Sequence, residues 1–348
     1  MCPNLKRMAR VFSGIQPSGE LHLGNLLGAL VNWVDHQKSH DAVYCIVDLH
    51  ALTLPKNPEE LRKNSLELAQ LLIAVGINPE ESILFMQSHV PEHSQLAWLM
   101  ECTVSFGELN RMTAFKDKSG RNEFISGGLF TYPALQAADI LLYDTDLVPV
   151  GDDQRQHIEI TRDIAERFNS RFGDTFVVPK HVIPPAGARI MDLQHPERKM
   201  SKSELSPGGT ISVLETPESI TKKIKRAVTD SDGDVRFDVE EKPGVSNLLS
   251  ILAAATSSTP EMVASSYSRY GDLKSDTADA VIALLRPIQE KFRELAKNSG
   301  LKAGQLFFPI RIALTGRKES PPLFDTMCAI GKEKSINRLY SAISIIKS

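Results

Sequence analysis

The sequence has little cysteine, and the few cysteines are scattered. The 348 residues contain no C-x-x-C pair and only Cys2, Cys45, Cys102 and Cys328. Cysteines so far apart argue against a metal cluster and against a disulfide framework, and they favour a reducing compartment. We therefore expect a cytoplasmic protein without a structural metal ion.

Long apolar runs and a strong net charge are missing as well. No stretch approaches the roughly 18 consecutive apolar residues of a membrane span, and the basic first residues lack the apolar core of a secretory signal. The net charge is −3, from 40 Lys and Arg against 43 Asp and Glu. No global basic field would therefore attract nucleic acid, and any such contact must use a local patch. We expect no membrane association.

The first half of the chain alternates between strand and helix patterns. Extended or apolar runs at 10–15, 42–49, 83–87 and 147–150 are separated by amphipathic helical patterns. The run AVYCIVDL at 42–49 is almost continuously apolar, as in a parallel strand covered on both faces. This alternation predicts an α/β fold, a Rossmann-like doubly wound parallel sheet that binds ligands at the carboxyl ends of its strands.

The strand signal fades after about Ser203, and the remainder of the chain is mostly helical in pattern. We predict a first domain over residues 1–203 and an all-helical second domain over 204–348. Within the first domain, the segment 92–143 is rich in apolar surface for an insertion. No internal repeat is evident.

Two loops carry candidate chemistry, and the first is SGIQPSGELHLGN at 13–25. Gly14 and Gly19 permit tight turns, and His22 and Asn25 lie three apart at the start of a helix, where free N–H groups suit an anionic phosphate chain. No GxxxxGK[ST] phosphate loop occurs. Alone, this segment could equally be an ordinary strand-to-helix turn with a surface histidine.

The second loop is KMSKS at 199–203. Lys199 and Lys202 lie three apart among small hydroxyl residues, which is typical of a mobile cationic clamp that closes on a pyrophosphate leaving group. A five-residue match could also be an exposed basic loop. HLGN after the first strand together with KMSKS after the last one is far more specific than either motif.

Together the two motifs resemble the signatures of class I aminoacyl-tRNA synthetases, with HLGN as the HIGH-type motif. Over residues 10 to about 295 the sequence is similar to the tryptophanyl-tRNA synthetase family in particular, through FSGIQPSG, CIVDLHA, RMTAFKDKS, LLYDTDLVPVGDDQRQH, GARIMDL, KMSKS and KIKRAVTDSDG. The resemblance implies activation of L-tryptophan with Mg-ATP to tryptophanyl-adenylate and pyrophosphate, followed by transfer to tRNA(Trp).

The same resemblance implies an organisation for the chain. Residues 1–203 would form the catalytic domain, with a dimerisation insertion at about 92–143, and residues 204–348 a helical anticodon-binding domain. The enzyme would act as a homodimer, with ATP and Mg²⁺ as substrate and no protein-bound metal ion.

The stretch ALQAADILLY at 134–143 places a carboxylate, Asp139, in a largely apolar run. A buried carboxylate without a partner costs several kcal/mol, so Asp139 needs either a partner in the protein or a ligand. On a helix, Tyr132, Gln136, Asp139 and Tyr143 would form one polar stripe. An indole N–H is only a donor, so a buried acceptor suits it, and the resemblance implies that role for Asp139. The alternative is an ion pair between Asp139 and a core arginine.

Other roles follow from the resemblance residue by residue. It implies catalytic roles for His22, Lys199 and Lys202 and a phosphate-facing role for Lys118. The implied ATP site comprises Gln16, Pro17, Ser18, Gly24, Asn25, Gly151, Asp152, Asp153, Ile190, Lys199, Met200, Ser201, Lys202 and Ser203. The implied tryptophan pocket comprises Asp139, Phe12, Val47, His50, Tyr132, Gln136 and Gln154.

Two features depart from the family, and two rival functions remain open. Gln136 stands where bacterial members usually have methionine, and residues 306–339 of the atypical tail 300–348 resemble the end of the anticodon-binding domain of glutamyl-tRNA synthetases. A tyrosyl-tRNA synthetase would share the fold but is disfavoured by AADILLY and VGDDQRQH. A non-catalytic paralogue that binds tryptophan or nucleotide is disfavoured by the intact HLGN and KMSKS motifs.

Overall fold

Five parallel strands form the central sheet of the computed structural model. They are β1 (Arg10–Ile15), β2 (Asp41–Ile46), β3 (Ile83–Met86), β4 (Leu147–Pro149) and β5 (Lys180–Val182). Their order is β3-β2-β1-β4-β5, so the winding reverses between β1 and β4, where open α/β sheets place their ligands. The predicted Rossmann-like parallel sheet is therefore confirmed.

The structure describes residues 8–19, 21–112, 125–151, 154–182, 189–201, 208–298, 330 and 332–347. The chain divides into two compact units, Met1–Phe292 and Arg293–Ser348. The expected boundary near Ser203 falls outside the described residues and stays a prediction. After residue 208, the described elements are all helices, as expected for that part of the chain.

Helices alternate with the strands and follow the last of them. The first unit contains α1 (Leu23–Asn25), the π-helix η1 (Leu26–Leu30), α2 (Val31–Ser39), α3 (Asp48–Ala51), α4 (Pro58–Val75), the 3-10 helix η2 (Gln87–His89), α5 (Glu92–Glu101), α6 (Phe106–Asn110), α8 (Gly127–Leu141), α9 (Arg155–Phe172), α10 (Pro217–Lys225), α11 (Pro243–Ala255) and α12 (Pro260–Ala264). Helix α13 (Tyr270–Asn298) crosses into the second unit, which also contains α16 (Lys332–Lys347). Among the described residues, no helix is both long and apolar enough to cross a membrane.

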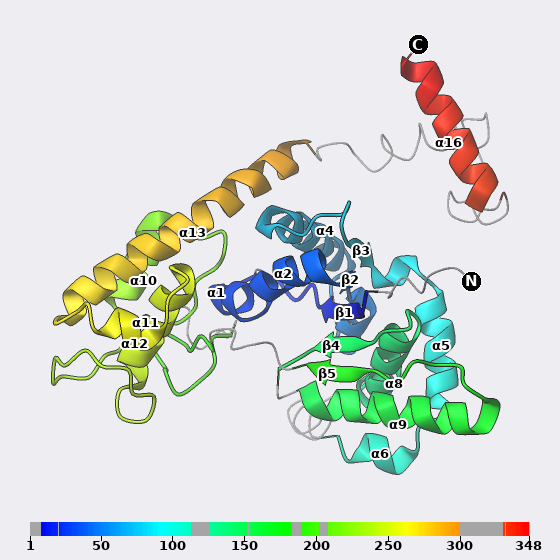
Figure 1. The fold of residues 1–348 in the computed structure, drawn as a ribbon, viewed down its shortest axis with the longest axis horizontal. Helices are drawn as coiled ribbons and strands as arrows, with labels where there is room; N and C mark the ends of the chain where they lie inside the picture. The colour runs from blue at the N-terminus through cyan, green and yellow to red at the C-terminus, as the bar shows by residue number, and fades with distance from the viewer. Residues whose placement is uncertain are drawn as a thin grey trace, which may run out of the picture. The chain divides into compact units, whose positions relative to one another are not determined.

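The two faces of the sheet are packed differently. Helices α2 and α4 lie on one side and α8 and α9 on the other (Figure 1). On the first side, Trp33 of α2 stacks on Tyr44 of β2 with ring centroids 4.7 Å apart. On the second side, the sheet residues Phe12, Val43, Cys45, Val47 and Val148 pack with Ile140 of α8 and Ile158 of α9. This second cluster forms the base on which the candidate site is built.

One local prediction differs from the observed structure. The apolar run 42–49 was expected to be a strand throughout, but β2 ends at Ile46 and α3 begins at Asp48. The Asp48 carboxylate is the reason, because it accepts hydrogen bonds from the Ser88 backbone N–H at 2.9 Å and the Ser88 hydroxyl at 2.5 Å. This anchor turns the chain at the carboxyl edge of the sheet and places His50 there.

Helix α8 carries the carboxylate that the sequence singled out. The helix begins where the Ser126 side chain accepts the Leu129 N–H, a standard N-cap. Asp139 is 1% exposed. The predicted stripe is interrupted at its fourth member, because α8 ends at Leu141 and Tyr143 falls beyond it. Tyr143 instead stacks on Phe12, with ring centroids 5.8 Å apart.

Candidate active site

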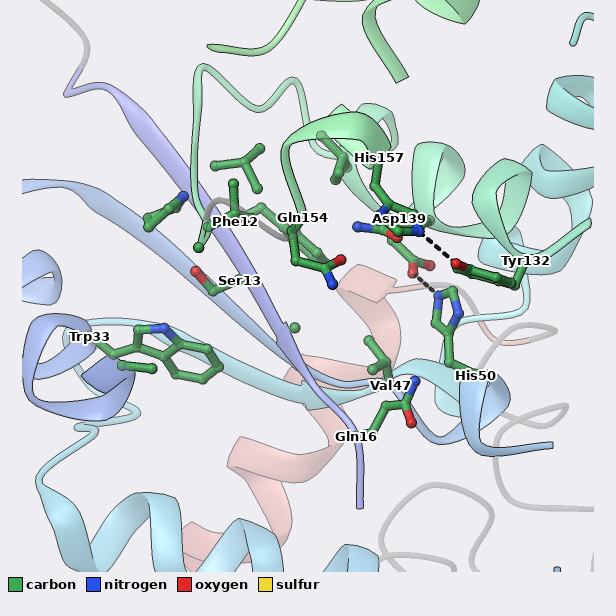
Figure 2. Close-up of a pocket in the computed structure, with 18 residues that line it drawn as sticks. Phe12, Ser13, Gln16, Trp33, Val47, His50, Tyr132, Asp139, Gln154 and His157 are labelled. Carbon is green, nitrogen blue, oxygen red and sulfur yellow. Dashed lines mark hydrogen bonds and ion pairs between the residues drawn. The ribbon is translucent and has the colours of Figure 1, made fainter. Parts of the chain in front are cut away.

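A cavity of about 470 Å³ lies at the carboxyl ends of β1, β2 and β4. The structure brings together here the seven residues predicted to bind tryptophan, namely Phe12, Val47, His50, Tyr132, Gln136, Asp139 and Gln154. Figure 2 marks a hydrogen bond between Asp139 and His50 and another between Tyr132 and His157. Gln16 and Gly151, predicted to bind ATP, also line the cavity. Its walls therefore combine an apolar slot with a few convergent polar groups, as small-molecule sites do.

Asp139 has partners inside the protein, and among the described residues none of them is the arginine of the alternative interpretation. His50 Nε2 donates to Oδ2 at 2.8 Å. The second oxygen, Oδ1, accepts Gln87 Nε2–H at 2.7 Å and His93 Nδ1–H at 2.6 Å. Within the described residues, Asp139 is thus held by two histidines and one amide.

An ionised carboxylate has about four acceptor positions, two on each oxygen. Gln87 and His93 fill both positions on Oδ1, and His50 fills one on Oδ2. No fourth donor from the described part of the chain bonds to Asp139. Counting donors from the described residues, one acceptor position on Oδ2 is thus unfilled, and Asp139 lines the cavity.

The charge of Asp139 is stabilised by its surroundings. Burial acts to raise the pKa of this carboxyl group, but the hydrogen bonds from His50 and His93 outweigh burial and hold the pKa below its ordinary value of 3.8. Asp139 is consequently a carboxylate at neutral pH and can only accept hydrogen bonds.

Several residues of this site escaped the sequence analysis. Gln87 and His93 follow strand β3, and His157 Nε2 lies 2.6 Å from the Tyr132 hydroxyl. Ser13 Oγ lines the cavity, is buried, and has no hydrogen-bond partner among the described residues. The signal for Gln87 and His93 was present in the polar segment QSHVPEH, which directly follows an expected strand.

A second cavity of about 310 Å³ is lined by the turn after β1 and includes Gln16, Ser18, His22 and Asn25. Gln16 lines both cavities, so the two adjoin. His22 and Asn25 bond reciprocally: His22 Nδ1 accepts the Asn25 N–H at 3.3 Å, and Asn25 Oδ1 accepts the His22 N–H at 3.2 Å. With Nδ1 accepting, the ring proton of a neutral His22 is on Nε2, which can donate to an anion.

His22 is neutral near pH 7. Burial, together with the positive charge of Lys199, lowers its pKa to about 4. A neutral imidazole donates a hydrogen bond to phosphate without adding a charge, so the fixed positive charge near this cavity comes from lysine.

The fold brings the HLGN and KMSKS segments together. Leu23 N–H donates to the Ile211 carbonyl at 2.9 Å, just beyond the KMSKS loop. Met200 N–H donates to the Ile190 carbonyl at 3.0 Å, and both of these side chains are buried. A Cβ added to Gly24 would lie 3.1 Å from the His22 ring and 3.4 Å from Met200, so glycine permits this close approach. Lys199 and Ser201 are exposed at this junction.

The remaining predicted residues divide into two groups. Pro17 is buried in the turn after β1, and Ser18 is exposed there. Lys118, Asp152, Asp153, Lys202 and Ser203 lie outside the described residues. No group of three or more His, Cys, Asp or Glu side chains in the described part of the chain is placed to hold a metal ion.

Comparisons with known proteins identify the family of this chain. The family described as tRNA synthetases class I (W and Y) matches residues 4–286, and an anticodon binding domain matches residues 256–343. The tryptophan–tRNA ligase of Caldanaerobacter subterraneus subsp. tengcongensis is 51% identical over 85% of this chain and 91% of the relative. That of Oceanobacillus iheyensis is 55% identical over 85% and 91%.

Solved structures give the same result. A tryptophanyl-tRNA synthetase from Mycoplasma pneumoniae superposes with a TM-score of 0.78 at 35% identity, covering 97% of this chain and 95% of the other. One from Campylobacter jejuni, complexed with ADP and tryptophan, superposes with a TM-score of 0.71 at 31% identity, covering 97% and 100%. The chain therefore belongs to the class I tRNA synthetases of the tryptophan and tyrosine group, and within that group to the tryptophan–tRNA ligases.

Proposed function

We propose that this chain activates L-tryptophan with Mg-ATP in the two adjoining cavities and then transfers it to tRNA(Trp). A carboxylate oxygen of tryptophan attacks the α-phosphorus of ATP, and the bond from that phosphorus to the bridging oxygen breaks as pyrophosphate leaves. A hydroxyl of the terminal adenosine of tRNA then attacks the carbonyl carbon, and AMP leaves. No protein nucleophile takes part, so catalysis consists of positioning and charge stabilisation.

The observation that carries this proposal is the single acceptor position left on Asp139. It matches an indole N–H, which donates one hydrogen bond and accepts none. Phe12 and Val47 supply apolar walls for the ring, while Tyr132, Gln136 and Gln154 supply polar atoms for the rest of the amino acid. The phenol hydroxyl of tyrosine is also a donor, so this position alone does not separate the two amino acids. The tryptophan–tRNA ligase relatives favour tryptophan.

The phosphate chain is assigned to the second cavity and its surroundings. His22 Nε2–H, with the turn residues Gln16 and Ser18, would bind phosphate oxygens. Gly24 and Asn25 at the start of the helix, Gly151, Ile190 and the KMSKS residues Lys199 to Ser203 complete the proposed ATP site. Lys118, Asp152 and Asp153 belong to the same proposal through sequence resemblance alone. Mg²⁺ enters with ATP as part of the substrate.

Amino-acid-dependent pyrophosphate exchange tests the proposal directly. The full chain is incubated with ATP, Mg²⁺, labelled pyrophosphate and each of the twenty amino acids in turn. We expect label to enter ATP with tryptophan alone. Exchange that depends on tyrosine would point to the tyrosine enzymes, and no exchange with any amino acid would point to a non-catalytic paralogue.

A homodimer is part of the proposal, supported by exposed apolar side chains on α5 and α6. Trp98 is 65% exposed and Phe106 is 71% exposed, in the segment 92–143 that the sequence analysis assigned to dimerisation. Large apolar side chains rarely remain exposed in such a group unless another surface covers them. We propose that a second copy of the chain covers this surface.

Trp98→Glu is therefore expected to shift the mass in solution from dimer to monomer, because a charge would be buried in the interface. Light scattering at micromolar concentration measures this. Met262→Glu is the matched control, since Met262 is 66% exposed on α12, outside that segment. A monomeric mass for the unaltered chain would reject the dimer.

The tail beyond about residue 300 is proposed to contact the anticodon arm of tRNA. The anticodon binding domain matches through residue 343. The tail also contains Lys302, Arg311, Arg317, Lys318, Lys332, Lys334, Arg338 and Lys347 against Glu319, Asp325 and Glu333, a local positive excess in an acidic chain. Such an excess favours a phosphate backbone. The alternative is a helix that braces the rest of the chain.

Truncation after Ser299 should leave tryptophan-dependent pyrophosphate exchange nearly unchanged and raise the KM for tRNA, since exchange needs no tRNA. Exchange, aminoacylation and the melting temperature are measured on the same preparation. Joint loss of exchange activity and thermal stability would identify the tail as a structural brace.

A cytoplasmic location remains a prediction from the scattered cysteines of the sequence.

A further inference from the structure

A hydrogen-bonded chain leads from Asp139 away from the cavity, through side chains that the proposed reaction does not use. His93 of α5 is 0% exposed and links two groups. Its Nδ1 lies 2.6 Å from Asp139 Oδ1, and its Nε2 lies 2.7 Å from the Tyr143 hydroxyl. Phe85 of β3 packs beside the His93 ring, with centroids 5.7 Å apart.

The chemistry of the partners fixes the direction of these bonds. An ionised carboxylate only accepts, so His93 Nδ1 carries the proton that points to Asp139. Burial raises the pKa of Tyr143 above its ordinary range, so its hydroxyl keeps its proton. In an uncharged imidazole, a proton on Nδ1 makes Nε2 the acceptor, here for the Tyr143 O–H at 2.7 Å. The Tyr143 hydroxyl thus favours the tautomer in which Nδ1 donates to Asp139.

Gln87 has an equally defined orientation. Its Oε1 accepts the Leu49 backbone N–H at 3.1 Å, which leaves its Nε2–H to donate to Asp139 Oδ1. Oδ1 is therefore saturated by two donors, and rotation of the carboxylate would break both bonds. When the donors of the described residues are counted, only Oδ2, which also accepts from His50, retains an acceptor position.

We propose that His93, oriented by Tyr143, is a positioning residue that determines selectivity for a substrate ring bearing an N–H. By occupying Oδ1, it confines the free acceptor position of Asp139 to Oδ2 at the cavity. Without His93, Oδ1 loses one donor, so the carboxylate can rotate or bind water at that oxygen. The preference of the site for a ring with an N–H over a ring without one should then fall. This inference rests on the proposed function, because it concerns how the same site recognises tryptophan.

A purely structural role for His93 would also destabilise the protein when the side chain is replaced, since it joins α5 to α8. The two roles differ in substrate selectivity. A brace changes stability without changing which ring is preferred. A positioning residue changes the preference between tryptophan and an analogue that lacks the N–H donor.

The experiment measures kcat/KM in pyrophosphate exchange for L-tryptophan and for its benzothiophene analogue, in which sulfur replaces the N–H. Three variants of the full chain are compared. His93→Leu removes the donor, His93→Asn keeps an amide N–H near the Nδ1 position, and Tyr143→Phe removes only the hydroxyl behind His93. Melting temperatures are recorded for each variant.

We expect the unaltered chain to prefer tryptophan strongly, because the analogue leaves the acceptor position of Asp139 unpaired. In His93→Leu the preference should fall by about tenfold or more, mainly through the KM for tryptophan. His93→Asn should recover most of it, and Tyr143→Phe should show a smaller loss than His93→Leu.

An unchanged preference in the variants, with lowered melting temperatures, would overturn the inference and leave His93 as a brace. Should His93→Leu fail to fold, His93→Asn and Tyr143→Phe still decide the question, since only the positioning role gives Tyr143→Phe a reduced preference. If the unaltered chain does not distinguish tryptophan from the analogue, Asp139 does not read the ring N–H and the inference falls. If tryptophan supports no exchange, the proposed function itself fails. This outcome is distinguishable from a failure of the inference about His93, in which tryptophan does support exchange.

Discussion

Replacing Asp139 with asparagine is expected to raise the KM for tryptophan in pyrophosphate exchange by about tenfold to a hundredfold, or about 1–3 kcal/mol. An asparagine side chain must place its NH₂ group at one of the two former oxygen positions. At the Oδ1 position the NH₂ faces Gln87 and His93, and at the Oδ2 position it faces His50 and the indole N–H. In either placement an N–H donor of the asparagine faces other N–H donors, so hydrogen bonds are lost.

Asp48→Asn is the matched control for this variant. Asp48 is also a buried carboxylate, but it anchors Ser88 and does not belong to the cavity lining. We expect it to lower the melting temperature while raising the KM for tryptophan far less than Asp139→Asn does, because Asp48 acts on the pocket only through the chain turn before His50. An unchanged KM in Asp139→Asn would mean that Asp139 serves the core alone.

The ionisation of Asp139 gives this prediction a pH range. Its folded pKa lies below the ordinary value of 3.8, so the stability that the carboxylate contributes is present above that value. It is lost only as the pH falls below 3.8 through the folded pKa. Between pH 5 and 8 the effect of Asp139→Asn on KM should therefore not vary through titration of Asp139.

Replacing Lys199 with alanine is expected to lower the rate of adenylate formation by about a hundredfold to a thousandfold, with little change in tryptophan binding. Lys199 is exposed at the junction of HLGN and KMSKS, close enough that its charge lowers the pKa of His22. Its ammonium group would stabilise negative charge that develops as pyrophosphate leaves. Removing it should therefore destabilise the transition state more than the ground state. Lys202→Ala should behave in the same way.

Single-turnover adenylate formation and the equilibrium dissociation constant for tryptophan measure the two quantities separately. Arg198→Ala is the control, because Arg198 is the exposed neighbouring cation and pairs with Glu197 at 3.5 Å. We expect it to leave both quantities near those of the unaltered chain. Equal losses of rate and tryptophan affinity in Lys199→Ala would contradict the role of KMSKS as a clamp on the leaving group.

Local patterns in the sequence located the motifs and four of the five strands, but they did not predict β5 (Lys180–Val182). Extended or apolar runs located β1 to β4, since burial on both faces demands apolar side chains at nearly every position of a central strand such as β2. The three residues of β5 are too few to give such a run. Asp139 stood out because a carboxylate in an apolar helix requires a partner. The sequence by itself therefore determined the fold class, the two signature loops and the most informative residue of the pocket.

Only the tertiary structure decided which groups Asp139 meets. His50 and His93 are separated from it by 89 and 46 residues in sequence, and Gln87 by 52. No periodicity relates positions so far apart, because they converge only when β1, β2 and β3 align and α5 packs on α8. The free acceptor position on Oδ2 is found only by counting the hydrogen bonds that Asp139 accepts in the folded structure. For that physical reason the sequence could point to Asp139 and could place Gln87 and His93 in a polar segment at the end of a strand, but it could not show that they bond to Asp139.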